Sequence, residues 1–225
     1  MRAHILQHTV STTPGSTIEW LESENIPFTI TQFFNPDPII PSLDSFNLLI
    51  VCGGEMNVDE EDKYPWLRLE KKFIKSALEK NKKVVGLCLG GQLMAEALGA
   101  HVGKHKTWEV GWWPVELNLP ASLKISPLNI LTPFQFHGYS FETPGGAQCF
   151  ASSKACENQA FLWGQNAIGF QFHPESTKAW VLECAQEKLP SGPFVQTQQQ
   201  MIDGNQYQTE LQCWYFEILN SLKNS

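Results

Sequence analysis

The stretch KKVVGLCLGGQL, residues 82–93, places a cysteine in a turn flanked by glycines. An apolar run leads into the spacing Gly86-x-Cys88-x-Gly90, and a helix-favouring segment follows. This pattern is typical of a nucleophile elbow, in which a strained backbone projects a reactive side chain from a strand-to-helix turn. The flanking residues must be small because the strand and the helix approach each other closely. Taken alone, the stretch has two interpretations: a nucleophile, or a small buried thiol in a tight loop.

The position of the thiol at a helix N-terminus suits a nucleophile. The positive end of the helix dipole favours the thiolate form of Cys88. The backbone amide of Leu89 then points to the side on which an oxyanion forms. A cysteine nucleophile also needs a base and a group that orients the base.

His173 is the best candidate for that base. It lies at the end of the strand pattern AIGFQFHP, residues 167–174, which Pro174 stops. Glu175 is two residues further on. Its carboxylate can therefore turn back, accept a hydrogen bond from the imidazole and fix its tautomer.

The other five histidines have simpler interpretations. His101 and His105 are four residues apart, but Gly103 between them argues against a helix, so we expect a solvated pair and no metal site. His137 lies in FQFHGYSF, a glycine-containing bend that can line a pocket. The remaining two are expected to pack or hydrogen-bond in the first strand region: His4 and His8.

Strands and helices alternate along the first half of the chain. This order predicts a parallel sheet with helices on both faces. The apolar runs are continuous, as in strands buried on both sides. Strands are expected at 3–8, 27–33, 46–51 and 83–89, and helices at 14–25, 64–81 and 91–99.

The second half is richer in aromatic residues and turns, which predicts mixed and antiparallel strands added to the parallel core. We expect one α/β domain over 1–225, with a core at about 3–188 and a C-terminal helical extension at about 189–225. The segment 190–206 is expected to be a surface loop or a short helix. Strands are expected at 109–117, 133–141, 147–153, 159–164 and 167–174, and helices at 176–189 and 207–222.

Composition excludes several classes of function. The 225 residues carry a net charge of −7 without a basic stripe, so neither nucleic acid nor an anionic membrane is an expected partner. No signal peptide or membrane span is recognisable. The scattered cysteines are therefore interpreted as reduced thiols of a cytoplasmic protein: Cys52, Cys88, Cys149, Cys156, Cys184 and Cys213.

Two motifs in this order resemble the signature pair of the class I (triad) glutamine amidotransferases: GLCLGGQ at 86–92 and GFQFHPES at 169–176. The likeness runs from about residue 4 to about residue 185 and is to the GMP-synthase-like standalone branch. It implies a flavodoxin-like fold. It also implies a catalytic triad of Cys88, His173 and Glu175.

The resemblance implies roles for further residues. Gly54 matches the residue that supplies a second oxyanion amide beside Leu89, although it can also simply permit a turn. Gln92 matches a substrate contact, although it can also cap the helix after the elbow. A four-residue segment matches the one that holds the ends of the substrate, largely through backbone groups: Phe136, His137, Gly138 and Tyr139.

Three features depart from the family pattern. Glu55 stands where relatives often have proline, so its carboxylate either opposes the developing negative charge or faces solvent. Tyr139 stands where many relatives have aspartate. The chain also has no synthetase domain that would consume ammonia.

The expected function is therefore hydrolysis of the glutamine amide through a cysteine thioester, with ammonia delivered to an unidentified acceptor or synthetase partner. One alternative is a γ-glutamyl peptidase that uses the same triad on another γ-glutamyl compound. Another is a non-catalytic regulatory or interaction module. A homodimer is possible, and no cofactor is expected because no phosphate loop, metal cluster or dinucleotide fingerprint is present.

Overall fold

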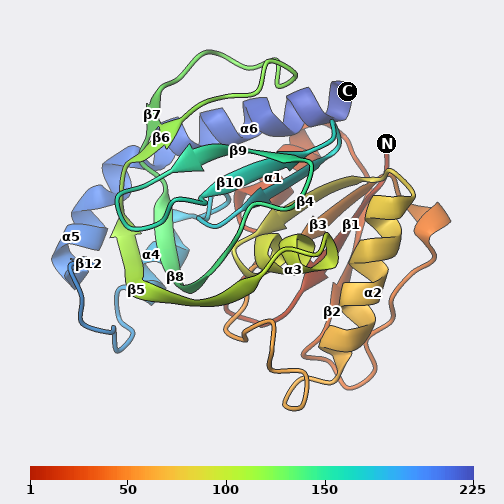
Figure 1. Ribbon diagram of the computed structural model, residues 1–225, viewed down its shortest axis with the longest axis horizontal. Helices are drawn as coiled ribbons and strands as arrows, with labels where there is room; N and C mark the ends of the chain where they lie inside the picture. The colour runs from red at the N-terminus through yellow and green to blue at the C-terminus, as the bar shows by residue number, and fades with distance from the viewer.

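A nine-stranded sheet runs through the molecule in the order β2-β1-β3-β4-β11-β10-β9-β6-β7 (Figure 1). The structure is a computed structural model that describes all residues 1–225. Five neighbouring strands are parallel, as the alternation of strands and helices predicted. They are β2 (Phe28–Gln32), β1 (Ala3–Gln7), β3 (Leu48–Val51), β4 (Lys83–Leu87) and β11 (Ala167–Phe170).

The remaining strands of this sheet are antiparallel to their neighbours, which confirms the predicted mixed second half. The sheet is therefore mixed, with a parallel half and an antiparallel half, and its α/β class is the expected one. These strands are β10 (Ala160–Trp163), β9 (Ala147–Ser152), β6 (Val115–Leu117) and β7 (Ile130–Leu131).

Both faces of the parallel strands are buried, because alternate residues enter different hydrophobic clusters. Leu48 and Ile50 pack into one cluster, and Leu49 and Val51 into the other. Figure 1 shows α2 (Trp66–Glu79) and α3 (Leu89–Ala97) on one side of the sheet. The other side is covered by α1 (Ser16–Ser23) and α6 (Gln208–Asn224).

A second, three-stranded sheet consists of β12 (Phe194–Val195), β5 (Val102–Trp112) and β8 (Phe134–Phe141). The expected strand at 109–117 is in fact the end of β5 followed by β6, and β5 begins at Val102. The antiparallel pairing of β5 with β8 carries the segment 136–139 to the carboxyl end of β4.

Three further boundaries differ from the sequence expectation. Strand β11 ends at Phe170, and His173 adds only an isolated bridge to Phe134. The helix expected at 176–189 is α4 (Lys178–Cys184), capped by the side chain of Thr177. The segment 190–206 contains β12 and a short helix, α5 (Gln198–Asp203). Two 3₁₀ turns complete the chain: η1 (Leu43–Ser45) and η2 (Gly204–Tyr207).

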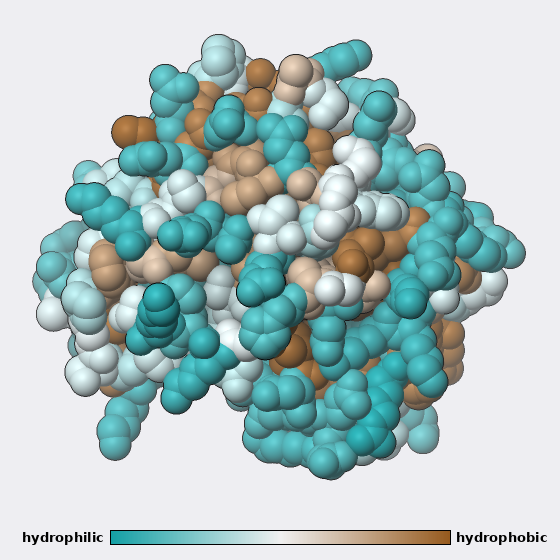
Figure 2. Space-filling model, in the orientation of Figure 1, coloured by the Kyte–Doolittle hydropathy of each residue, from teal (hydrophilic) through white to brown (hydrophobic).

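Helix α6 is part of the core. Trp214 and Tyr215 belong to the larger hydrophobic cluster, and the Tyr215 hydroxyl lies 3.0 Å from Oγ1 of Thr17. Trp112 is also buried. Of the helices, none is both long and apolar enough to span a bilayer. The face drawn in Figure 2 is largely hydrophilic, with hydrophobic residues in separate small patches.

Candidate functional site

Cys88 has the strained backbone of a nucleophile elbow. Its φ is 50° and its ψ is −105°, a region that residues with a Cβ seldom adopt. The flanking glycines are required because β4 and α3 lie close together. A Cβ on Gly86 would lie 2.5 Å from the Gly90 carbonyl. A Cβ on Gly90 would lie 2.0 Å from the carbonyl oxygen of Val51. The sequence between β4 and α3 can therefore fold in this way only with glycine on both sides of the cysteine.

His173 and Glu175 form the hydrogen bond that their spacing predicted. The distance between Nδ1 of His173 and Oε1 of Glu175 is 2.8 Å, and both side chains are only 3% exposed. This bond occupies Nδ1 and leaves Nε2 for the sulfur. The imidazole and Cys88 both lie next to Gly53. A Cβ on Gly53 would lie 3.0 Å from Cε1 of His173 and 3.7 Å from Cβ of Cys88.

The charges around His173 favour its protonated form. Burial alone would lower its pKa, but the negative charges of Glu175 and of the Cys88 sulfur, with hydrogen bonds to both, raise the pKa to about 10. A cationic imidazole beside sulfur is the environment in which cysteine reacts as a thiolate. The arrangement therefore places a thiol beside a group that can donate a proton.

A cavity of about 90 Å³ opens over the sulfur. Gly54, Phe136 and His173 line it together with Cys88. The amide of Gly54 donates no hydrogen bond within the protein, and Leu89 is the first residue of α3, where an amide has no partner within the helix. Two backbone donors are thus free where a reacting carbonyl would need them.

Gln92 and Gln171 form a buried amide pair beneath the sulfur. Nε2 of Gln92 donates to Oε1 of Gln171 and to the carbonyl of Tyr139, both at 3.3 Å. Nε2 of Gln171 lies 3.7 Å from Sγ of Cys88. No role was predicted for Gln171 from the sequence, although its position two residues before His173 was a usable signal. Gln92 is 3% exposed and does not line the cavity.

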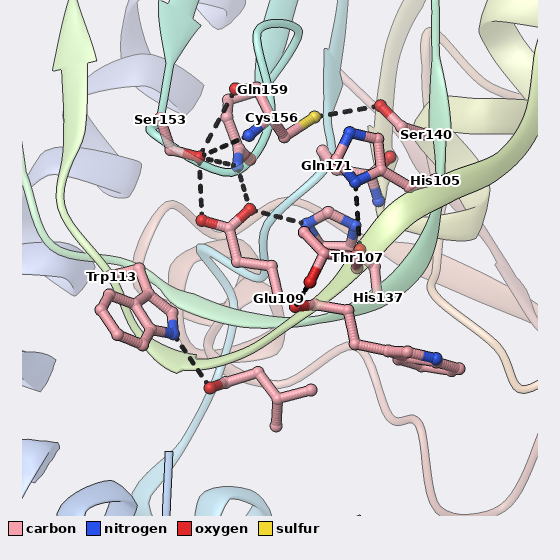
Figure 3. A network of polar contacts seen from close by, with 12 residues as sticks. His105, Thr107, Glu109, Trp113, His137, Ser140, Ser153, Cys156, Gln159 and Gln171 are labelled. Atoms are coloured by element: carbon pink, nitrogen blue, oxygen red, sulfur yellow. Dashed lines mark hydrogen bonds and ion pairs between the residues drawn. The ribbon is translucent and has the colours of Figure 1, made fainter. Parts of the chain in front are cut away.

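The side chain of His137 takes part in a buried network (Figure 3). Its Nε2 lies 3.2 Å from Oε2 of Glu109, and its Nδ1 lies 3.0 Å from the carbonyl of Tyr139. Gln159 and Ser153 also donate to the Glu109 carboxylate, at 2.7 and 2.8 Å. This network fixes the backbone of β8 where the carbonyl of Phe136 faces the sulfur at 4.0 Å.

Gly138, the third residue of the segment expected to hold the substrate, packs against Trp108. A Cβ at this position would lie 2.7 Å from the indole ring. A side chain here would have to displace the indole ring, and with glycine the segment presents only backbone groups.

Of the two residues that depart from the family pattern, only Glu55 lines the cavity. Its carboxylate accepts a hydrogen bond from Oγ of Ser11 at 3.1 Å. Partial burial and the charge of Glu55 raise the pKa of Glu187 across the cavity mouth. Burial, followed by the charges of Asp59 and Glu60, raises the pKa of Tyr139. The lining of the cavity is acidic, because it contains Glu55, Glu183 and Glu187.

The chain is similar to known proteins over most of its length. The family model "Glutamine amidotransferase class-I" matches residues 15–179. The glutamine amidotransferase-like protein YfeJ of Salmonella typhimurium is 29% identical over 230 residues, which cover 96% of this chain and 95% of that one. One subunit of the glutamine-hydrolysing GMP synthase of Sulfolobus acidocaldarius is 30% identical over 62% of this chain and 73% of its own.

Solved structures agree with this family. A glutamine amido transferase from Methylobacillus flagellatus superposes with a TM-score of 0.92 at 28% identity, covering 99% of this chain and 94% of that one. A glutamine amidotransferase from Thermotoga maritima gives a TM-score of 0.87 at 26% identity, covering 100% and 99% of the two chains.

Proposed function

The chain belongs to the class I glutamine amidotransferase family, and we propose that it hydrolyses the side-chain amide of glutamine through a thioester on Cys88. Members of this family generally hydrolyse glutamine and transfer its ammonia. The observation that carries the proposal is the strained elbow of Cys88 facing a His173 that is hydrogen-bonded to Glu175 at 2.8 Å.

The first half-reaction is acyl transfer to sulfur. The Cys88 thiolate attacks the amide carbon, a C–S bond forms, and the carbonyl oxygen becomes an oxyanion. The amides of Leu89 and Gly54 stabilise this oxyanion, and each such donor typically lowers the barrier by roughly 3–4 kcal/mol. The C–N bond then breaks while His173 gives its proton to the leaving nitrogen, so ammonia departs.

The second half-reaction returns the enzyme to its starting state. The neutral His173 takes a proton from water, and the resulting hydroxide attacks the thioester. The second oxyanion collapses, the C–S bond breaks, and glutamate leaves. Glu175 holds the ring in the tautomer that presents Nε2 to the sulfur, and it stabilises the cationic ring.

A separate protein is the proposed destination of the ammonia. The similar chain from Sulfolobus acidocaldarius is by name one subunit of a GMP synthase. We infer that this chain likewise supplies ammonia to a separate acceptor protein.

A specific feature favours a second candidate, hydrolysis of a larger γ-glutamyl amide. A hollow of about 550 Å³ adjoins the cavity through Ser11 and Glu55. Phe34, Met56 and Trp66 are among its lining residues, so it offers apolar space for a substituent on the leaving nitrogen.

The test measures ammonia and glutamate release from glutamine and, separately, from γ-glutamyl peptides. Ammonia release from glutamine that is abolished by Cys88→Ala and retained by Cys213→Ser, which removes an exposed thiol, supports the first proposal. Glutamate release from the peptides alone supports the second. If neither substrate turns over and Cys88 is not labelled by a glutamine-like alkylating agent, both proposals fail and a non-catalytic module is left.

A further inference from the structure

A buried ion pair lies beneath the loop that follows β3. Nε2 of His8 is 2.7 Å from Oε1 of Glu70, and neither side chain has any exposed surface. His8 comes directly after β1, and Glu70 belongs to α2. The imidazole is nearly parallel to Phe33 and Trp66, with interplanar angles of 8° and 9°. Burial would lower the pKa of His8, but the charge of Glu70 and hydrogen bonds to Glu70 and to backbone carbonyls raise it.

The second ring nitrogen of His8 reaches the candidate oxyanion loop. A protonated imidazole donates from both nitrogens, and Nδ1 lies 2.8 Å from the carbonyl oxygen of Gly53. The Gly53–Gly54 peptide is trans, so its N–H points away from its C=O. Since the C=O is directed at the buried imidazole, the N–H of Gly54 faces the opposite side. That amide has no other partner, and Gly54 lines the cavity over Cys88.

The loop cannot hold this orientation by its own side chains. A Cβ on Gly53 would lie 3.0 Å from the His173 imidazole, and one on Gly54 would lie 2.7 Å from the sulfur of Met56, so a side chain at either position would have to displace its neighbours. A peptide between two glycines can rotate with little steric cost. Its direction therefore has to be set from outside the loop.

We propose that His8, held by Glu70, is a positioning residue that fixes the Gly53–Gly54 peptide with its amide toward the reacting carbonyl. The inference rests on the proposed acyl transfer at Cys88, because only that chemistry develops an oxyanion there. His8 touches neither the substrate nor the sulfur in this role; it acts through the peptide.

Two double variants test this role, and each of them removes the charges of both His8 and Glu70. Glu70→Leu replaces the buried carboxylate by an apolar group, a change that well-packed cores tolerate when the partner charge is removed as well. Combined with His8→Phe, it leaves Gly53 without a donor. Combined with His8→Asn, it retains an amide N–H where Nδ1 stood. Glutamine hydrolysis, the rate of Cys88 alkylation by iodoacetamide and thermal unfolding are measured for both.

The His8→Phe combination is expected to lower kcat about 10²- to 10³-fold, the effect of losing one oxyanion donor, with KM within about threefold. The His8→Asn combination is expected to recover most of that loss. Alkylation of Cys88 is expected to be unchanged in both, because displacement of iodide forms no oxyanion. His4→Phe is the control and should leave kcat unchanged, since His4 is a buried histidine on β1 that bonds only Thr29 and Thr31.

Equal kcat values for the two double variants, or a parallel loss of alkylation, would overturn the inference. A crystal structure of each variant gives a reading that does not depend on turnover. The Gly53–Gly54 peptide should keep its direction with His8→Asn and lose it with His8→Phe, and an unchanged peptide in both would contradict the inference. Failure of the proposed function would look different, because the unaltered protein would then release no product from any substrate tested.

Discussion

At the scale of single residues, a positive φ distinguishes Cys88 from the other cysteines. Among the non-glycine residues, only two asparagines share its positive φ. The sequence could predict this position and the His173–Glu175 contact, because both are local patterns: one turn, and two residues at a strand end. The position of Gln171 two residues before His173 places it near the site, but the pattern does not show which partner it meets, since its contact with the sulfur joins residues 83 positions apart.

The raised pKa of His173 predicts an alkaline limit to activity. The leaving nitrogen needs the proton of the imidazolium, which is lost as pH rises through the folded-state value of about 10. Ammonia release, measured from about pH 6 to about pH 11, is expected to fall on that side. Because the pKa is raised by folding, the associated stability is full below 6.5 and disappears as pH approaches about 10.

The matched variant is Glu175→Gln, which removes the largest contribution that raises this pKa. It is expected to move the alkaline limb to lower pH as well as lowering kcat. A limb that stays in place in this variant would mean that another group limits the reaction.

At the scale of elements, the unit that matters is β4, the elbow and α3. Both elements were predictable because an apolar run and a glycine-flanked turn are strong local signals. Their boundaries were less so: the strand was expected at 83–89 and the helix at 91–99, whereas β4 ends at Leu87 and α3 runs from Leu89 to Ala97. Strand β5 was harder to predict because its first residues, from Val102, alternate between partly buried and exposed, and several are lysine or histidine. That strand is defined by its pairing with β8, a segment distant in the sequence that no local pattern reveals.

Gly90→Ala is expected to damage both stability and activity. The new Cβ would meet the Val51 carbonyl at 2.0 Å, so α3 must shift, at a cost of about 1–3 kcal/mol in the free energy of unfolding. The shift also moves the Cys88 turn, which should lower kcat by roughly 10²-fold. Denaturant titration and glutamine hydrolysis measure the two effects.

Gly145→Ala is the control for this change. Gly145 is exposed, and a Cβ added to it would meet no neighbouring atom. The free energy of unfolding should therefore stay within about 0.5 kcal/mol of the unaltered protein, and kcat should be unchanged. Similar losses in the two variants would show that the close approach of β4 and α3 is not the cause.

At the scale of the whole molecule, the last helix is bound into the core that carries the site. The family model ends at residue 179, yet α6 buries Leu211, Ile218 and Leu222 against the sheet. The sequence predicted this helix from its pattern but placed it in an extension beyond the core, because local periodicity does not reveal which surface a helix covers. Homodimer formation stays a prediction, which light scattering in solution can test.

A chain shortened to residues 1–207 is therefore expected to lose its folded structure. Each buried side chain of α6 contributes roughly 2 kcal/mol, so its loss is on the order of the 5–15 kcal/mol by which domains are stable. Circular dichroism and thermal unfolding measure the outcome. The full chain should unfold in a single transition, and two separate transitions would contradict one shared core.

The His8–Glu70 pair also has an evolutionary consequence. Its two members lie 62 positions apart on different elements, and either one alone would leave an uncompensated charge in the interior. Single substitutions at one of these positions should be selected against, whereas paired replacement by apolar residues keeps the fold. Positions 8 and 70 should therefore covary among relatives, and lineages in which the pair has become apolar should be those that have also abandoned the reactive cysteine.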